Sequence, residues 1–164
     1  MMKHARLFFA AAFTMLFLAA PALADSPHWV NTSAAVSQTT GALTATFKVA
    51  GLGTNVLDTI TLNANASAVY QCFNNGGKHP QAGNKTTVTS PVSNSGSFPS
   101  GKNGAINSSL SVDPPSQGSF SCPSGQTLYL QSVTYTDVVL SDTSGAGNAP
   151  IAGTFSASSI HVQI

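Results

Sequence analysis

The stretch between Cys72 and Cys122 concentrates amino and amide side chains that could hold a ligand. Three of the four lysines after residue 24 lie there, and no aspartate falls between Asp58 and Asp113, so the stretch has a local excess of positive charge. Lysine ammonium groups and glycine-rich backbone can together hold a carboxylate or an acidic sugar, and asparagine amides offer donors and acceptors to sugar hydroxyls. The candidate ligand-binding residues are Asn74, Asn75, Lys78, His79, Asn84, Lys85, Lys102 and Asn103.

A simpler interpretation of these residues stays open. Lysine and asparagine keep exposed turns soluble, and asparagine tolerates the positive φ that tight turns require. The stretch contains such turns, for example Asn74-Asn75-Gly76-Gly77 and Gly101-Lys102-Asn103-Gly104. The eight residues are therefore either a ligand site or ordinary loop residues.

The acidic residues and histidines give little support for catalysis. A glycosidase needs two carboxyl groups at a set separation, one of them with a raised pKa. A Ser-His-Asp hydrolase would need His79 or His161 as its base, but no G-x-S-x-G motif surrounds any serine. We therefore expect a protein without enzymatic activity, with a hydrolase as the least supported alternative. The acids considered for it are Asp58, Asp113, Asp137 and Asp142.

Metal and cofactor sites are not predicted either. The three histidines after residue 24 are scattered singly, and no calcium loop of the D-x-D-x-D-G kind occurs. Only 7% of the 164 residues are charged, and lysine plus arginine number six against five acidic residues. A nucleic-acid partner, which needs a basic surface, is therefore excluded.

Residues 1–24 have the composition of a secretory signal peptide. Lys3 and Arg6 make a positive start, 7–20 is apolar, and Ala22-Leu23-Ala24 is an A-x-A cleavage site. The apolar run is shorter than the roughly 20 residues that cross a bilayer as a helix, although an uncleaved anchor is the alternative. We expect cleavage before Asp25 and a secreted protein, extracellular or periplasmic, with no membrane attachment.

Both cysteines, Cys72 and Cys122, follow the cleavage site. In an oxidising compartment an even number of cysteines favours disulfides, and two cysteines allow one pairing. Closing a loop of about 50 residues stabilises a protein by roughly 4 kcal/mol in the chain-entropy treatment. We predict a Cys72–Cys122 disulfide, with two buried free thiols as the alternative.

Apolar and polar residues alternate along most of the remaining chain, which is the period of β-strands. The clearest case is 58–73, where Ile60, Leu62 and Tyr70 share one face. The segment 76–104 is the least regular, and we expect a long excursion over one end. The alternation changes phase near Gln131-Ser132, which either a bulge or burial of both faces would explain. Further strands are predicted over 29–36, 43–49, 106–112, 126–140 and 151–164.

Regularly spaced strands and turns without helical windows favour an antiparallel β-sandwich of immunoglobulin-like architecture. We expect one domain, 25–164. The antibody pattern itself is not met. Tyr70-Gln71-Cys72 places the Tyr-x-Cys spacing at the first cysteine rather than the second, and the single tryptophan, Trp29, precedes both cysteines.

One block of the chain is distinctive. It reads Tyr70-Gln71-Cys72-Phe73-Asn74-Asn75-Gly76-Gly77-Lys78-His79-Pro80 and is followed by Asn84-Lys85. This block resembles one found in small exported proteins of unknown function. The resemblance implies secretion and a β fold for most of the chain after the signal peptide, and it carries over no site residue.

Aromatic residues could form a stacking platform for sugars, and the candidates are Trp29, Tyr70, Tyr129 and Tyr135. Core packing explains Tyr70 at least as well, because it shares a face with Ile60 and Leu62. Tyr129 and Tyr135 share a parity on one predicted strand. Exposure of both would make an aromatic strip of the kind found at recognition surfaces.

Two functions from different classes are compatible with these patterns. The leading one is a secreted, non-enzymatic module that binds an extracellular or cell-envelope ligand, such as a glycan, through its Asn/Lys/Gly-rich loops. The alternative is a structural or assembly subunit of a surface or fimbrial structure. Its terminal run Ile160-His161-Val162-Gln163-Ile164 would then supply an unprotected strand edge. The sequence does not specify the oligomeric state.

Overall fold

Every regular element that the structure describes is a β-strand. The computed structural model describes residues 26–74 and 80–164, so the predicted signal peptide lies outside the described residues. The prediction of an all-β chain is confirmed. The strands are His28–Val36 (β1), Leu43–Ala50 (β2), Leu57–Asn74 (β3), Pro80–Pro99 (β4), Ile106–Val112 (β5), Gln126–Asp142 (β6), Asn148–Ile151 (β7) and Phe155–Gln163 (β8).

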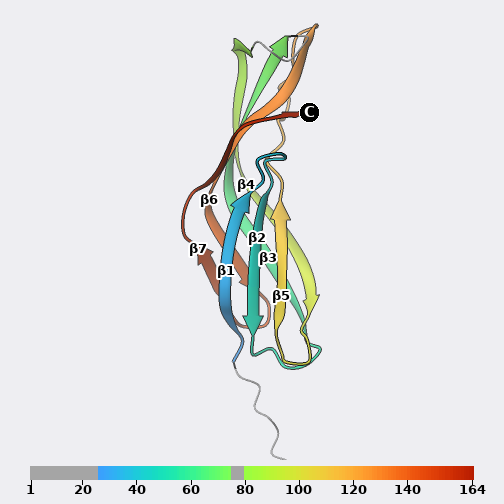
Figure 1. Ribbon diagram of the computed structural model, residues 1–164, viewed down its shortest axis with the longest axis vertical. Helices are drawn as coiled ribbons and strands as arrows, with labels where there is room; N and C mark the ends of the chain where they lie inside the picture. Colours follow the sequence, from blue (N-terminus) through green and yellow to red (C-terminus); the bar gives the residue numbers. More distant parts are fainter. Residues whose placement is uncertain (1–25, 75–79) are drawn as a thin grey trace, which may run out of the picture.

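The strands form two antiparallel sheets. One sheet has the order β1-β2-β5, and the other has the order β4-β3-β6-β7, with β8 also paired to β6. Figure 1 shows an elongated molecule in which β1, β2 and β5 lie in front of the second sheet. The chain passes between the sheets at 51–56, 100–105 and 113–125.

One hydrophobic core lies between the sheets, and the alternation of side chains creates it. Every second residue of β2 from Leu43 to Val49 is buried, and so is every second residue of β3 from Asp58 to Cys72. The intervening residues of these strands are more exposed and mostly polar, as strands with one buried face require. Each buried leucine or phenylalanine contributes about 1.5–3 kcal/mol.

A bulge changes the phase of β6, which is one of the two explanations that the sequence leaves open. The register between β3 and β6 slips between Leu130 and Ser132, so Gln131 has no residue opposite it. The same break occurs between β6 and β8. Because of this extra residue, Leu130 and Val133 both face the core although their parities differ.

The expected excursion over 76–104 is wrong for most of that range, because β4 is a strand of 20 residues paired with β3. As an edge strand, β4 carries polar residues on both faces, so its hydrophobic alternation is weak. Gly96 belongs to an Asn-Ser-Gly run of a composition typical of turns, but it lies inside this strand. A Cβ atom at Gly96 would stand 2.9 Å from the ring of Phe98, so the glycine leaves space for that ring.

The ends of β3, β4 and β6 extend past the first sheet and form an arm, at the upper end of Figure 1. The predicted disulfide is confirmed there: Cys72 on β3 is bonded to Cys122, which lies in the connection between β5 and β6. The hydroxyl of Tyr70 donates a 2.6 Å hydrogen bond to the carbonyl of Pro115 in the same connection. These two links hold the connection against the inner face of the arm.

One seam between the sheets is closed by β1 and the segments after β6. The indole Nε1 of Trp29 donates to the Gly147 carbonyl at 3.0 Å, and the Gln38 amide donates to the Ser156 carbonyl at 3.3 Å. The indole also packs edge-on against Phe47, with ring centroids 6.0 Å apart. Trp29 therefore seals this seam.

Candidate functional site

The structure divides the predicted loop residues between the two ends of the molecule. Lys102 and Asn103 lie in the turn between β4 and β5, where the Lys102 carbonyl accepts a 3.1 Å hydrogen bond from Thr54. Lys85 lies near the other end of β4. The intervening length of β4 spans roughly 45 Å at the ordinary rise of a strand. Lys85 and Lys102 therefore cannot act on one small ligand, and the expectation of a single lysine cluster is corrected.

The asparagines near Lys85 are engaged with a neighbouring amide. Asn84 donates to the Gln126 side-chain oxygen at 2.8 Å, and Gln126 donates to the Asn74 side-chain oxygen at 3.3 Å. This chain of amides links β3, β4 and β6 across the arm. Asn74 and Asn84 therefore brace the arm in this arrangement. The remaining predicted residues, Asn75, Lys78 and His79, lie outside the described residues, and their ligand-binding role stays a prediction.

A row of four side chains crosses the outer face of the arm. Lys85 on β4 lies opposite Gln71 on β3. Gln71 in turn lies opposite Tyr129 on β6, and Tyr129 lies opposite Gln163 on β8. Directly opposite residues of antiparallel strands project from the same face, with Cβ atoms about 5 Å apart. Because Tyr70, next to Gln71, points into the core, the row lies on the solvent side.

Two further rings pack against Tyr129. The His161 ring lies 4.4 Å from the Tyr129 ring at an interplanar angle of 32°, and Phe73 meets both rings edge-on. Phe73 is buried, Tyr129 is half-buried and His161 is exposed, so Phe73 forms the floor of an aromatic surface. We name the following six residues the arm site: Gln71, Phe73, Lys85, Tyr129, His161 and Gln163.

The arm site combines three kinds of recognition chemistry within one row. The rings of Tyr129 and His161 offer an apolar face, the amides of Gln71 and Gln163 offer donors and acceptors, and Lys85 offers a positive charge. Three interstrand spacings separate the ends of the row, which corresponds to roughly 14 Å. That length suits an extended, largely uncharged ligand with one anionic group.

The predicted aromatic strip of Tyr129 and Tyr135 is not formed. The bulge at Gln131 reverses the direction of the residues that follow it, up to a second register shift between Thr136 and Val139, so Tyr135 turns into the core and is fully buried. Its hydroxyl donates a 2.8 Å hydrogen bond to the Gly41 carbonyl. Burial raises the pKa of Tyr135 well above its ordinary value, and the charge of Asp113 adds to the shift. Tyr70 is buried as core packing predicts, and burial raises its pKa as well.

Two of the candidate catalytic acids hold the turn between β6 and β7. Asp58 is fully buried and accepts hydrogen bonds from the backbone N–H and the hydroxyl of Thr143, at 3.1 and 3.0 Å. Asp142 accepts hydrogen bonds from three backbone N–H groups within 144–147. The hydroxyl of Ser144 contacts both carboxylates. These bonds account for both carboxylates as structural groups.

The electrostatics of Asp142 also argue against acid catalysis. Burial opposes its ionisation, but the hydrogen bonds from the Ser144 hydroxyl and from the backbone of the turn outweigh burial and lower its pKa. A general acid needs the opposite shift. The Asp137 carboxylate accepts hydrogen bonds from the side chains of Asn65 and Thr136, at 2.9 and 3.2 Å. In the described part of the chain, the side chain that forms a hydrogen bond with the His161 ring is Gln131.

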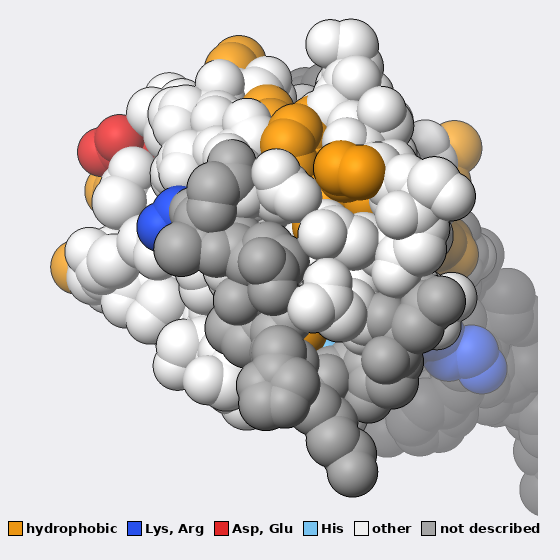
Figure 2. All heavy atoms as spheres, turned by 90° about the horizontal axis from the view of Figure 1, so that it is seen from above, with side chains coloured by type: hydrophobic (Ala, Val, Ile, Leu, Met, Phe, Trp, Pro, Cys, Tyr) orange, Lys and Arg blue, Asp and Glu red, His pale blue; other side chains and the backbone are white. Residues whose placement is uncertain are grey.

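Within residues 26–74 and 80–164, no group of three or more His, Cys, Asp or Glu residues could hold a metal ion. No helix long and apolar enough to span a membrane occurs in the same ranges. Figure 2 looks onto the arm end of the molecule: uncharged polar atoms and hydrophobic side chains dominate its coloured surface, with few charged groups. No protein family, curated protein or solved structure matches the chain.

The sequence points to Lys85, Tyr129, His161 and Gln163 separately but does not group them with Gln71 and Phe73. Gln71 falls on the polar side of the alternation over 58–73, which is the signal that could have found it. The aromatic packing of Phe73 and His161 depends on the pairing of β6 with β3 and β8. Strand pairing is a long-range property, and local alternation does not specify it.

Proposed function

We propose that this chain is a secreted, non-enzymatic β-sandwich protein that binds an extracellular or cell-envelope carbohydrate at the arm site. The observation that carries the proposal is the pair of adjacent, mutually tilted rings of Tyr129 and His161 on the outer face of a four-strand framework. Aromatic rings with a polar edge are enriched where proteins contact partners. The flanking amides would bond sugar hydroxyls, and their fixed spacing would orient the sugar.

Lys85 supports an acidic saccharide as the ligand. Without residues 1–24 the chain carries four lysines against five aspartates, so attraction of an anion is a local property and not one of the whole molecule. Lys85 is exposed at one end of the row, beside Gln71. A carboxylate at that end of the sugar chain would complement it.

An immunoglobulin-like connection of the strands is the finer fold assignment that we propose with this function. In the immunoglobulin scheme β1, β2 and β5 correspond to strands A, B and E, and β3, β6 and β8 to strands C, F and G. β4 lies beside β3, the counterpart of strand C, whereas the fourth strand of the constant-type immunoglobulin scheme lies beside strand E. The disulfide ties the arm and not the two sheets, which departs from the antibody pattern. Because fold alone carries no function, the proposal depends on the arm site.

The alternative of an assembly subunit with a donated C-terminal strand has less support. The terminal run 160–164 is engaged: β8 pairs with β6, and the Ile164 N–H donates to the Leu128 carbonyl at 3.1 Å. Ser159 and His161 have φ values of 57° and 56°, which interrupt the regular edge that strand addition needs.

Calorimetric titration of the chain without residues 1–24 tests the proposal. The ligands are acidic oligosaccharides, neutral oligosaccharides and peptidoglycan fragments. Tyr129→Ala should weaken binding by about tenfold or more, since truncating a central aromatic contact residue costs about 2 kcal/mol or more. Lys85→Ala should weaken binding of acidic ligands only. Lys102→Ala, the same change at the opposite end of β4, is the matched control and should have no effect. Absence of binding by every ligand, or equal losses from Lys85→Ala and Lys102→Ala, would contradict the site.

A further inference from the structure

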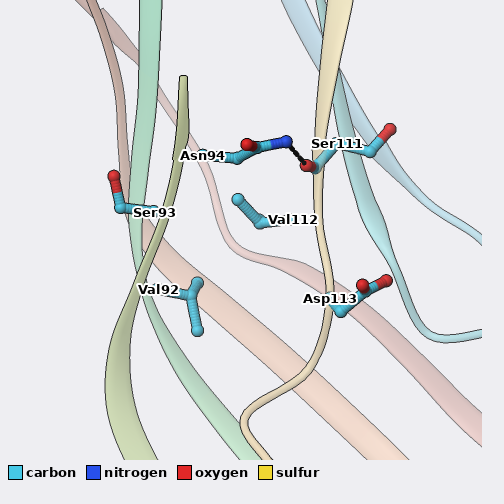
Figure 3. A pocket seen from close by; sticks show the side chains of 6 residues that line it. All are labelled: Val92, Ser93, Asn94, Ser111, Val112 and Asp113. Carbon is cyan, nitrogen blue, oxygen red and sulfur yellow. Dashed lines mark hydrogen bonds between the residues drawn. The ribbon is translucent and has the colours of Figure 1, made fainter. Parts of the chain in front are cut away.

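The second seam between the sheets, between the edge strands β4 and β5, is open. Figure 3 shows Val92 and Asn94 reaching from β4 toward β5, and Val112 reaching back. Asn94 donates a 2.8 Å hydrogen bond across this seam to the Ser111 carbonyl. A hollow of about 460 Å³ remains beside this bond, and its lining residues are Val92, Ser93, Asn94, Ser111, Val112 and Asp113.

The bond from Asn94 shows which backbone groups of β5 face the open seam. The Ser111 carbonyl points away from β2, and the N–H and C=O of a strand residue point to the same side, alternating along the chain. The register between β2 and β5 has no slip, so the alternation holds along the strand. Asn107, Ser109 and Ser111 therefore direct their backbone groups out of the sheet, where no described strand pairs with them.

The other sheet edges carry features that oppose strand addition. β4 contains Pro91, which has no N–H, and the Ser90 hydroxyl bonds the Pro91 carbonyl at 3.0 Å. β1 has a register shift after Trp29 and is tied to the β6–β7 turn. β8 has positive φ at Ser159 and His161. Among the described edges β5 alone is regular and free of proline, glycine and charge, so it is the unprotected one.

Opposite charges flank β5 at its two ends. Exposed Lys102 lies in the turn before the strand, and exposed Asp113 directly follows it. Antiparallel pairing of two such edges brings each Lys102 toward the Asp113 of the second copy, so the edge is complementary to itself under two-fold symmetry. We propose that β5 pairs antiparallel with β5 of a second copy of this chain. The dimer then contains one continuous sheet of six strands.

This pairing also accounts for the hollow at the seam. The second copy extends the β1-β2-β5 sheet over it, so the partly exposed Val92 loses contact with water. A carbonyl oxygen has two lone pairs, so Ser111 accepts a hydrogen bond from the second copy while keeping the one from Asn94. The β5 edge shares no residue with the arm site, so a test of the dimer and a test of the carbohydrate site can fail independently of each other.

Sedimentation velocity of the chain without residues 1–24, at protein concentrations from about 1 μM to about 1 mM, tests the dimer. We expect reversible dimerisation that weakens with added salt, because exposed charges are screened. Ser109→Pro should give a monomer throughout, since it removes an N–H that faces the free edge and leaves the β2–β5 hydrogen bonds intact. Circular dichroism checks that this variant is folded.

A charge exchange gives a second test that leaves the strand itself unchanged. Lys102→Asp and Asp113→Lys should each raise the dimer dissociation constant about tenfold, because two attractive contacts become repulsive in each dimer. The double variant should restore dissociation to within about threefold of the original. A monomer at every concentration, or an oligomer unaffected by Ser109→Pro and by both single exchanges, would overturn the proposal.

Discussion

The rings of Tyr129 and His161 lie 4.4 Å apart, on two strands that pair antiparallel in the arm. Their positions depend on the β6 bulge at Gln131, because the same extra residue that turns Tyr135 inward leaves Tyr129 on the outer face. One local irregularity thus separates a structural tyrosine from a surface tyrosine. The arm site is a consequence of strand register rather than of loop composition.

The Cys72–Cys122 disulfide should hold the arm in place for ligand binding. Replacing both cysteines with alanine should lower the free energy of unfolding by about 4 kcal/mol at most, because the bridge closes a loop of about 50 residues. Chemical denaturation measures that loss. Amide hydrogen exchange should show the largest increase in 68–74 and 113–125, whereas exchange in β2 should change little at the same temperature. A uniform increase along the chain would contradict a local role.

Asp142 should stabilise the protein in a pH-dependent way. Asp142→Asn removes charge-assisted hydrogen bonds and should cost about 2 kcal/mol at neutral pH. Because the pKa of Asp142 in the folded state is below its ordinary value of 3.8, its stabilisation is complete above that pH and is lost as the pH falls through the folded pKa. The stability gap between the two proteins should therefore narrow below about pH 4 in urea unfolding. Asp137→Asn, a more exposed position, is the control, and a gap that stays constant on acidification would refute this assignment.

Tyr135 should give the opposite dependence at alkaline pH. Tyr135→Phe leaves the Gly41 carbonyl without its buried donor and should cost about 1–2 kcal/mol at neutral pH. Because burial raises the pKa of Tyr135 in the folded state, the neutral hydroxyl stabilises the fold fully below about pH 10 and less as the pH rises. The variant should therefore lose less stability than the original protein above about pH 10. Thermal unfolding over that pH range measures these losses of stability, with Tyr129→Phe as the control. Equal losses for Tyr135→Phe and the original protein would contradict this account.

Gly96 should be required for space rather than for a turn. Gly96→Ala would place a methyl group 2.9 Å from the ring of Phe98 and should cost about 1–3 kcal/mol. Ser97→Ala, at the adjacent position on the outer face, removes only a solvent-exposed hydrogen bond to Thr59 and should stay within about 0.5 kcal/mol. Equal midpoints of denaturant unfolding for the two variants would show that the Phe98 ring can move aside without a loss of stability.

The sequence predicts much of the framework because its strands have one buried face. Alternation located β2, β3, β5 and β6, and the change of phase in β6 located the bulge. β4 was missed because its polar residues and its Asn94-Ser95-Gly96 run look like a loop. The arm site is only partly predicted, because Gln71 and Tyr129 come together through the pairing of β3 with β6, two strands that are far apart in the sequence. Composition alone grouped Lys85 with Lys102, although β4 keeps them at opposite ends.

The position of the ligand on the protein tests the central claim most directly. Backbone amide chemical shifts of the chain without residues 1–24 should be recorded during titration with an acidic oligosaccharide. We predict that the perturbed amides cluster on the outer face of the arm, around Gln71, Lys85, Tyr129 and Gln163, while those of the turn at 101–105 stay unchanged. Perturbations confined to that turn, or scattered over both ends of the molecule, would contradict the arm site.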